Sequence, residues 1–311
     1  MIEARALSRV LVIKHGALGD IVLATGPFAA IRRHHADAEL VLLTTAPYAA
    51  LARASPYFDE VWVDERPSLC QPRGIRRLRR LLREGGFSRV YDLQTSGRSS
   101  FYYHLFARPR PEWSGIARGA SHSHRNPKRD AMHTIERQRE QLADAGIADV
   151  SPPDIAWLDG DLTRFALPER FALLVPGGAA HRPRKRWPPG AYARLAALLK
   201  ARGLDTLLIG AAADRTALDA IAAAAPSVIN LGGRTSLGQI AALARRAALA
   251  IGNDTGPMHV IAAAGCPCVV LYSRASDPAL TAPRGAQVEI IAVDDLACLA
   301  PETVAAALKP R

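Results

Sequence analysis

The sequence predicts an α/β protein made of two doubly wound, Rossmann-like halves. Short continuous apolar runs alternate with longer segments of helical spacing along the chain, as parallel strands alternate with helices. Many of these runs end in turns of small and polar residues, and the pattern restarts at Phe171 after a loop-rich stretch. A length of 311 residues suits two domains, which we place at residues 1–165 and 166–311.

Each half contains several strand and helix candidates. In the first half, strands are expected at 9–14, 39–43, 60–64 and 88–94, and helices at 21–35, 47–54, 73–83 and 133–146. In the second half, strands are expected at 171–175, 206–209, 227–230, 249–251 and 268–272, and helices at 189–202, 237–246 and 301–308. The basic stretch 113–129 is expected to be a mobile, phosphate-facing loop. Ligands of such sheets bind beyond the carboxyl ends of the strands, so a cleft is expected between the halves.

The composition narrows the class of partner. Hydrophobic residues make up 49% of the chain and aromatic residues 6%, which is typical of a helix-rich α/β enzyme. A net charge of +11 indicates an acidic partner: a nucleotide, a phosphorylated glycan, an anionic membrane surface or nucleic acid. The basic residues are spread over strand-end loops with few aromatic residues among them, so no nucleic-acid partner is expected.

Cysteine usage and hydropathy indicate the compartment. The four cysteines contain no CxxC pair, and Cys266 and Cys268 flank a proline in an apolar run, so both are expected to be core thiols in a reducing cytosol. No signal-like segment and no run of 18 apolar residues is present, so a cytoplasmic protein is expected. Helix 73–83 has one apolar face surrounded by arginines. It is either an ordinary surface helix or a docking face for anionic lipid, which leaves open a peripheral position at the inner face of the inner membrane.

The stretch 252–259, Gly-Asn-Asp-Thr-Gly-Pro-Met-His, joins an apolar strand to an alanine-rich helix. The N-terminus of such a helix leaves backbone N–H groups free and carries partial positive charge, so the turn is expected to bind an anion. Asp254 and Thr255 are candidate caps of this helix, and His259 is expected to face the same mouth.

The first strand of the chain is followed by a glycine-rich turn that lacks the dinucleotide fingerprint. Gly16 and Gly19 would let the backbone approach a ligand closely. Asp20 lies where the next helix begins, so it is either an N-cap or a general base at the open end of the sheet.

The second half also has polar strand ends. Gly177 follows the strand 171–175, and Arg184 and Lys185 belong to a basic loop that suits a pyrophosphate. Asp214 follows the strand 206–209, where an acidic residue binds ribose hydroxyls or caps a helix.

Two short motifs have the spacing of metal ligands. His122-Ser-His124 has no third ligand nearby, and Asp159-Gly-Asp161 lies between proline-containing loops, which favours a surface turn. We therefore expect neither a metal nor a cofactor.

Three segments together resemble one enzyme family. Gly16-Ala-Leu-Gly-Asp20, Lys185-Arg-Trp-Pro188 and the stretch 252–259 are similar to the ADP-heptose:lipopolysaccharide heptosyltransferases, glycosyltransferase family nine, as are Asp92-Leu-Gln94 and the His133/Arg137 pair. The resemblance implies a GT-B fold, with two Rossmann-like domains facing across a cleft. It also implies an inverting, metal-independent transfer of a heptose or related sugar from an ADP-activated donor to a lipopolysaccharide core or other phosphorylated surface-glycan acceptor.

The resemblance assigns roles to individual residues. Asp20 is expected to be the catalytic base, and Lys185 the cation on the donor phosphates. The residues expected to bind the donor are Gly16, Gly19, Gly177, Arg184, Asp214, Asp254, Thr255, Gly256 and His259. The residues expected to bind acceptor phosphates are Arg98, Arg118, His133 and Arg137.

The chemistry is consistent with these roles. Inverting displacement of a nucleoside diphosphate needs a base for the acceptor hydroxyl and stabilisation of the departing charge, and fixed cations can replace a divalent metal. A sugar-nucleotide epimerase of the same fold is the alternative, but it would need further acidic residues and a histidine around the sugar that the sequence does not identify.

Overall fold

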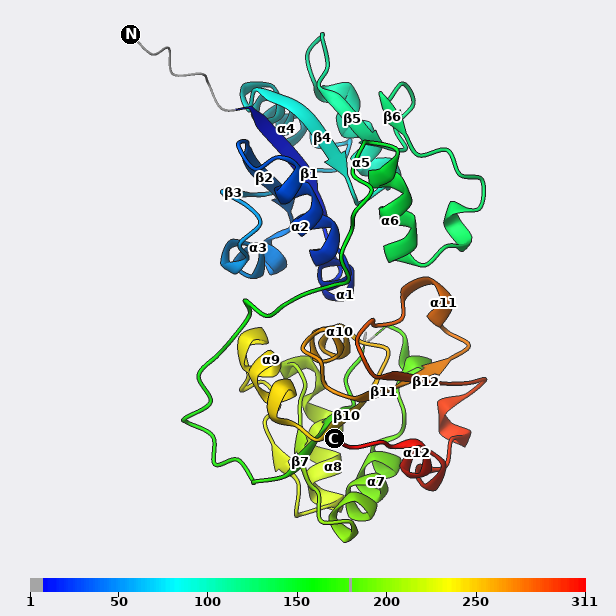
Figure 1. Ribbon diagram of the computed structural model, residues 1–311. Helices are drawn as coiled ribbons and strands as arrows, with labels where there is room; N and C mark the ends of the chain where they lie inside the picture. The colour runs from blue at the N-terminus through cyan, green and yellow to red at the C-terminus, as the bar shows by residue number, and fades with distance from the viewer. Residues whose placement is uncertain (1–7, 179–180) are drawn as a thin grey trace. The chain divides into compact units, whose positions relative to one another are not determined.

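The computed structural model describes residues 8–178 and 181–311. The chain divides into two compact units between Pro152 and Pro153, and each unit contains one six-stranded parallel sheet (Figure 1). The expected boundary lay after residue 165. The structure places it earlier because the connecting segment packs on the second unit, where the Arg245 guanidinium donates to the carbonyl of Leu158 at 2.8 Å.

In the first unit the strands follow the order β3-β2-β1-β4-β5-β6. The strands are β1 (Arg9–Ile13), β2 (Glu39–Thr44), β3 (Glu60–Val63), β4 (Phe87–Asp92), β5 (Glu112–Gly115) and β6 (His122–Ser123). The helices are α1 (Leu18–Leu23), α2 (Thr25–His34), α3 (Ala46–Ala54), α4 (Pro72–Glu84), α5 (Gly97–Tyr102) and α6 (Thr134–Ala143), with short 3₁₀ turns η1 (Tyr103–Leu105) and η2 (Arg129–Ala131).

In the sheet of the first unit, β1 is a central strand that pairs on both sides. Val12 pairs in parallel register with Leu42 of β2 on one side and with Tyr91 of β4 on the other. Both faces of β1 are covered, which explains why its sequence is a continuous apolar run rather than an alternating one. The chain switches from one side of β1 to the other between β3 and β4, so the switch point of the sheet lies between β1 and β4.

Two expectations for the first unit were wrong. The helix expected at 21–35 is two helices, because Pro27 has no N–H to donate to the carbonyl of Leu23, four residues earlier, and the Thr25 hydroxyl donates to the carbonyl of Val22 at 2.8 Å. The loop expected at 113–129 contains β5 and β6. These two strands, the last on this side of the sheet, are short, and their polar residues conceal the strand pattern.

In the second unit the strands follow the order β12-β11-β10-β7-β8-β9. The strands are β7 (Phe171–Val175), β8 (Asp205–Leu208), β9 (Ile229–Asn230), β10 (Leu249–Asn253), β11 (Cys268–Ser273) and β12 (Val288–Val293). The helices are α7 (Pro189–Ala201), α8 (Arg215–Ala224), α9 (Leu237–Arg246), α10 (Gly256–Ala263), α11 (Pro278–Thr281) and α12 (Pro301–Ala307), with 3₁₀ turns η3 (Pro183–Lys185), η4 (Ala212–Asp214) and η5 (Leu296–Cys298).

The second sheet repeats the topology of the first, with its switch point between β7 and β10. Leu174 of β7 pairs with Ile251 of β10, and both are fully buried. Cys266 and Cys268 are buried and free, as expected for core thiols, and burial raises the pKa of each to about 12. The sequence analysis did not find β12, a half-exposed edge strand.

Candidate functional site

The carboxyl ends of β1 and β4, at the switch point of the first sheet, hold the glycine-rich turn. Asp20 is the third residue of α1, and its Oδ2 accepts the N–H of Ala17 at 2.9 Å, so Ala17 rather than Asp20 occupies the N-cap position. Gly16 has φ of +120°, and a Cβ added there would lie 2.1 Å from the ring of Tyr48. Gly19 is buried in the first turn of the helix. The turn therefore requires glycine at position 16, and it leaves the Asp20 carboxylate on the first turn of α1.

A buried cation lies beneath this turn. Lys14 is 3% exposed, and its Nζ donates to the carbonyl of Leu93 at 3.2 Å. Burial lowers the pKa of Lys14, and the attraction of Asp20 and Asp92 opposes that effect. Lys14 therefore lies close enough to Asp20 and Asp92 for their charges to act on it.

Two predicted acceptor residues belong to α6, and this helix packs against α1, the helix that carries Asp20. His133 is buried at the N-cap of α6, where its Nδ1 accepts the N–H of Ile135 at 3.2 Å. Burial lowers the pKa of Arg137, as does nearby Arg129, whereas Asp20 raises it. Arg137 and Asp20 are thus close enough for their charges to interact.

The other two predicted acceptor residues lie on different elements. Arg98 is on α5, and its Nη1 donates to the carbonyl of Pro67 at 2.9 Å. Arg118 is exposed in the turn after β5.

The sequence analysis missed a buried polar network beside the turn. The Nε2 of His15 lies 2.9 Å from Oδ2 of Asp64, and the Tyr102 hydroxyl donates to the same oxygen at 2.6 Å. Burial raises the pKa of Asp64, but hydrogen bonds from His15, Tyr102 and the N–H of Arg66 leave it below its usual range. Asp64 comes directly after an apolar run and His15 follows one after a single lysine, and these positions were the available signal.

Asp92, the last residue of β4, is also buried near the switch point. Its Oδ1 accepts the N–H groups of Gln94 at 3.1 Å and Thr95 at 2.9 Å. Burial raises the pKa of Asp92 to about 6, although the hydrogen bonds from Thr95, Ser99 and Gln94 oppose the shift.

At the switch point of the second sheet, Lys185 and Asp254 form an ion pair. The Nζ of Lys185 in η3 lies 2.5 Å from Oδ2 of Asp254, and both side chains are nearly buried. Burial raises the pKa of Asp254, but the hydrogen bond and charge of Lys185 outweigh that effect, and His259 lowers the pKa further. The carboxylate thus fixes the ammonium beside the first turn of α10.

Asp254 and Thr255 do not cap α10 with their side chains. Thr255 occupies the N-cap position without a side-chain cap hydrogen bond, and the Asp254 carboxylate is engaged by Lys185. Gly256 is the first helical residue, and His259 is buried one turn further on. The side chains of both predicted caps therefore leave the N–H groups at this helix start uncapped, which suits an anion-binding end.

Asn253, the last residue of β10, joins the loops around this pair. Its amide nitrogen donates to the carbonyls of Pro176 at 2.8 Å and Gly177 at 3.1 Å. Its Oδ1 accepts the N–H of Trp187 at 3.1 Å and the hydroxyl of Tyr192 at 3.0 Å. A single buried amide thus holds the loop after β7 and the loop that carries Lys185.

Asp214 lies against the end of β7. Its Oδ2 accepts the N–H of Ala211 at 3.0 Å, and its Oδ1 lies 3.7 Å from Nη2 of Arg186. A Cβ added to Gly177 would lie 2.6 Å from Oδ2 of Asp214, so only glycine lets the Asp214 carboxylate lie this close to the backbone at position 177. Arg184 lies further out, where it lines a cavity of about 380 Å³ together with Arg274.

Neither metal-like motif has a complete ligand set. Among the described residues there is no group of three or more His, Cys, Asp or Glu side chains placed to hold a metal ion. Oδ1 of Asp161 accepts the N–H of Thr163 at 2.8 Å, so the Asp161 side chain closes an Asx turn here. No helix in the described part of the chain is long and apolar enough to span a bilayer.

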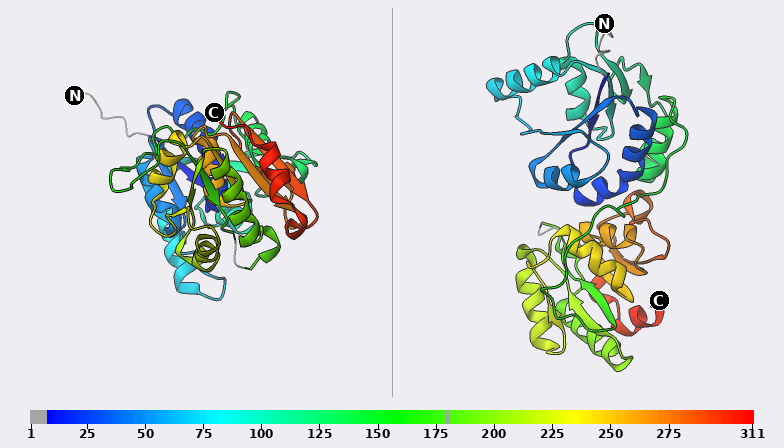
Figure 2. Two further views of the ribbon diagram at one scale, coloured as in Figure 1. Left: turned by 90° about the horizontal axis from the view of Figure 1, so that it is seen from below. Right: turned by 60° about the vertical axis from the view of Figure 1, so that its left-hand side comes forward.

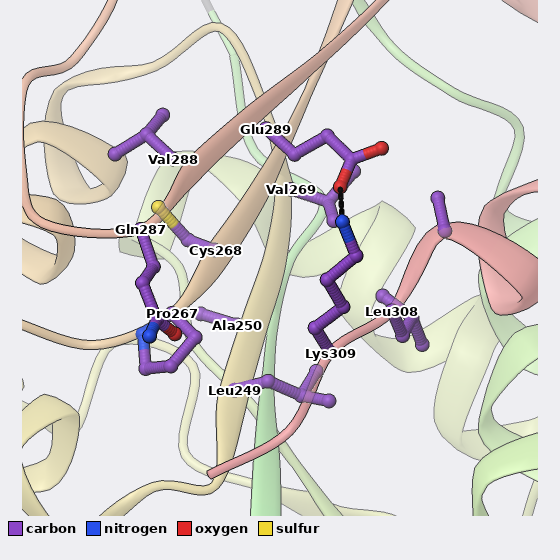
Figure 3. Close-up of a pocket in the computed structure, with 11 residues that line it drawn as sticks. Leu249, Ala250, Pro267, Cys268, Val269, Gln287, Val288, Glu289, Leu308 and Lys309 are labelled. Carbon is purple, nitrogen blue, oxygen red and sulfur yellow. Dashed lines mark ion pairs between the residues drawn. The ribbon is translucent and has the colours of Figure 1, made fainter.

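A cavity of about 320 Å³ lies at the other end of the second sheet (Figure 3). It is lined by the first residues of β10, β11 and β12, namely Leu249, Cys268 and Val288, and an ion pair of 3.9 Å between Lys309 and Glu289 borders it. Because ligands of such sheets bind at the carboxyl ends of the strands, this cavity is not the candidate site.

Comparisons with known proteins identify the family of the chain. The sequence model of glycosyltransferase family 9 (heptosyltransferase) matches residues 75–308. Lipopolysaccharide heptosyltransferase 2 of Escherichia coli K12 is 28% identical over 312 residues, covering 91% of this chain and 87% of that protein. The structure titled E. coli ADP-heptose lps heptosyltransferase II matches with a TM-score of 0.78 and 25% identity, covering 95% of this chain and 96% of that one.

Other solved structures bear on the fold alone. A glycosyltransferase family 9 protein from Veillonella parvula has a TM-score of 0.82 at 21% identity, covering 96% of this chain and 95% of that one. A UDP-GlcNAc 2-epimerase from Methanocaldococcus jannaschii has a TM-score of 0.53 at 10% identity, covering 93% of this chain and 89% of that one. The fold and its two switch-point sites define a glycosyltransferase of the GT-B type. The chain belongs to glycosyltransferase family 9, the heptosyltransferase family, and the epimerase alternative is not favoured.

Proposed function

We propose that this enzyme transfers a heptose from ADP-heptose to a phosphorylated glycolipid acceptor of the lipopolysaccharide type, with inversion and without a metal ion. Family membership supports the reaction class, and the E. coli relatives, named as lipopolysaccharide heptosyltransferases, support the choice of substrates. The observation that carries the proposal is the Lys185–Asp254 ion pair fixed beside the start of α10. We further propose that the enzyme works in the cytoplasm, as a peripheral protein at the membrane that holds such an acceptor.

In this proposal the second unit binds the donor. Lys185 has two N–H donors besides the one directed to Asp254, and a diphosphate would accept them together with the N–H groups at the start of α10. Because Asp254 and Asn253 hold the loops, these groups need little reorganisation as negative charge develops on the departing ADP. Asp214, beside Gly177, takes the ribose hydroxyls.

The first unit binds and activates the acceptor. Asp20 takes the proton of the acceptor hydroxyl as that oxygen bonds to the anomeric carbon of the heptose, while the bond from that carbon to the diphosphate oxygen breaks. The bonding electrons leave with ADP, and attack from the opposite face inverts the anomeric configuration. Arg137 and His133, on the helix packed against α1, hold the acceptor phosphate. Lys185, a fixed cation, and the partial positive charge of the helix end take the charge-neutralising role of a divalent metal.

The decisive experiment uses Asp20→Asn, with Asp37→Asn on the surface of the same unit as the matched control. The Asp20 variant should fold and bind ADP as the wild type does but lose about 10²–10⁴ in turnover, the usual contribution of a general base. Near-wild-type turnover would refute the role of Asp20.

Two further measurements test the reaction itself. EDTA should leave the rate unchanged, whereas a loss that Mg²⁺ or Mn²⁺ restores would overturn the metal-free mechanism. Incubation of ADP-heptose without acceptor should leave the sugar unaltered, because consumption of the donor alone is the behaviour of an epimerase.

A further inference from the structure

Helix α4 presents a stripe of arginines away from its own unit. Leu78 and Leu82 face the core, and the opposite face carries Arg73, Arg76 and Arg80 at spacings of three and four residues. All three arginines are exposed. In both views of Figure 2 the helix, drawn in cyan, lies at the margin of the first unit. The stripe is therefore accessible along its length.

The segment 63–84 is strongly basic. It contains seven arginines and three acidic residues, and one of the three, Asp64, is buried in the network with His15 and Tyr102. Of the other two, Glu65 pairs with Arg77 at 3.1 Å. The exposed face of α4 therefore keeps a large excess of positive charge.

Exposed apolar side chains adjoin the same helix. Among the residues that the structure describes, the exposed large hydrophobic side chains are Leu69, at 75%, and Val63, at 38%. Leu69 lies in the turn just before α4, and Val63 lines a groove of about 200 Å³ together with Arg77 and Arg80. Isolated exposed apolar side chains are ordinary on protein surfaces, but both of these lie beside the arginine-bearing helix.

The turn holds Leu69 in place. The N–H of Gln71 donates to the carbonyl of Ser68 at 2.9 Å, and Oε1 of Gln71 accepts the N–H of Ser68 at 2.9 Å. These two bonds close a four-residue turn with Leu69 and Cys70 at its tip. The leucine is thus presented to solvent by an ordered turn, at the N-terminal end of the arginine stripe.

We propose that α4 and the turn 68–71 form a docking surface for an anionic lipid bilayer. The arginines bind the headgroup phosphates, and Leu69 enters the boundary between headgroups and acyl chains. Nucleic acid is a poorer fit because the segment 63–84 contains no aromatic residue on which bases could stack. The inference agrees with a membrane-held acceptor in the proposed function, but lipid binding itself requires no transferase activity.

The test measures binding of the whole protein to vesicles of phosphatidylcholine with and without phosphatidylglycerol. The triple variant Arg73→Gln, Arg76→Gln, Arg80→Gln should lose about a hundredfold in partition to the anionic vesicles, since each basic residue near such a surface contributes about fivefold. Leu69→Gln should lose about tenfold. The control variant removes the same total charge from exposed arginines of the second unit. It carries Arg170→Gln, Arg215→Gln and Arg246→Gln.

The exposed cysteines supply a local readout. With Cys298 replaced by serine, a polarity-sensitive dye on Cys70, beside Leu69, should shift to the blue on anionic vesicles. The same dye on Cys298, with Cys70 replaced, should not shift.

Three results would overturn the inference. In one, the α4 and control variants bind vesicles equally. In another, vesicles bind without a shift of the dye on Cys70. In the third, the α4 variants keep vesicle binding but raise the KM for a water-soluble phosphorylated acceptor, which would assign the arginines to the acceptor instead. Failure of the proposed reaction would leave vesicle binding unchanged, so the two proposals are distinguishable.

Discussion

Replacement of Asp92 by asparagine should stabilise the enzyme at neutral pH. The carboxyl of Asp92 is fully buried at the end of β4, where burial raises its pKa to about 6 from an ordinary value of 3.8. Asparagine has the same shape, and its Oδ1 can still accept the N–H groups of Gln94 and Thr95. The substitution therefore removes a buried charge and keeps the turn that follows the strand.

The size of the effect follows from the two pKa values. At a pH below 3.8 the carboxyl is protonated in both the folded and the unfolded chain, so its burial does not lower the free energy of unfolding there. Stability is lost as the pH rises through about 6, where the folded carboxyl must ionise inside the protein. About two pH units at 1.36 kcal/mol each give about 3 kcal/mol at neutral pH.

Urea unfolding of both proteins between about pH 4.5 and 7.5 measures this effect. The unfolding free energy of Asp92→Asn minus that of the wild type should increase by about 2 kcal/mol across the range, because part of the loss occurs below it. For the control Asp37→Asn, at an exposed position, the difference in unfolding free energy from the wild type should not change with pH. A flat difference for Asp92→Asn, or lower stability than the wild type at neutral pH, would refute the reasoning that burial governs this carboxyl.

Two further variants test the second unit. Asn253→Ala should lower the unfolding free energy by about 2–5 kcal/mol, because it breaks four buried hydrogen bonds and leaves the N–H of Trp187 unpaired; a urea midpoint equal to that of the wild type would contradict this. Gly177→Ala should raise the KM for the donor about tenfold with little loss of stability, because the new methyl group displaces the carboxylate of Asp214. Gly190→Ala, where a Cβ meets nothing within 4 Å, is the control, and equal donor KM values for the two variants would exclude that displacement.

Much of the fold was accessible from local sequence. A strand buried on both faces needs a continuous apolar run, so β1, β2, β7 and β10 stand out in the sequence. Edge strands such as β6 and β12 are short or half-exposed, and polar residues interrupt them. The failures therefore lie at the edges of the sheets, where burial no longer constrains residue type.

The candidate site was predicted less completely than the fold. Turns rich in glycine and acidic residues after strands identified Asp20 and Asp254, because chain direction alone places such turns at the ligand-binding edge of a parallel sheet. The partners of these residues were not predictable: Lys185 and Asp254 are 69 residues apart in sequence and 2.5 Å apart in space. Likewise, His15 and Asp64 meet only because β1 and β3 belong to one sheet.

The sequence by itself determined the repeated strand–helix pattern, the glycine-dependent turn at Gly16 and the place where α10 begins, because each depends on backbone geometry within a few residues. Only the tertiary structure decided which charges are paired and which are buried. Asp254 became the partner of Lys185 rather than a helix cap, and Asp92 became a carboxyl with a pKa of about 6. Pairing and desolvation depend on atoms brought together from distant parts of the chain, and no local pattern records them.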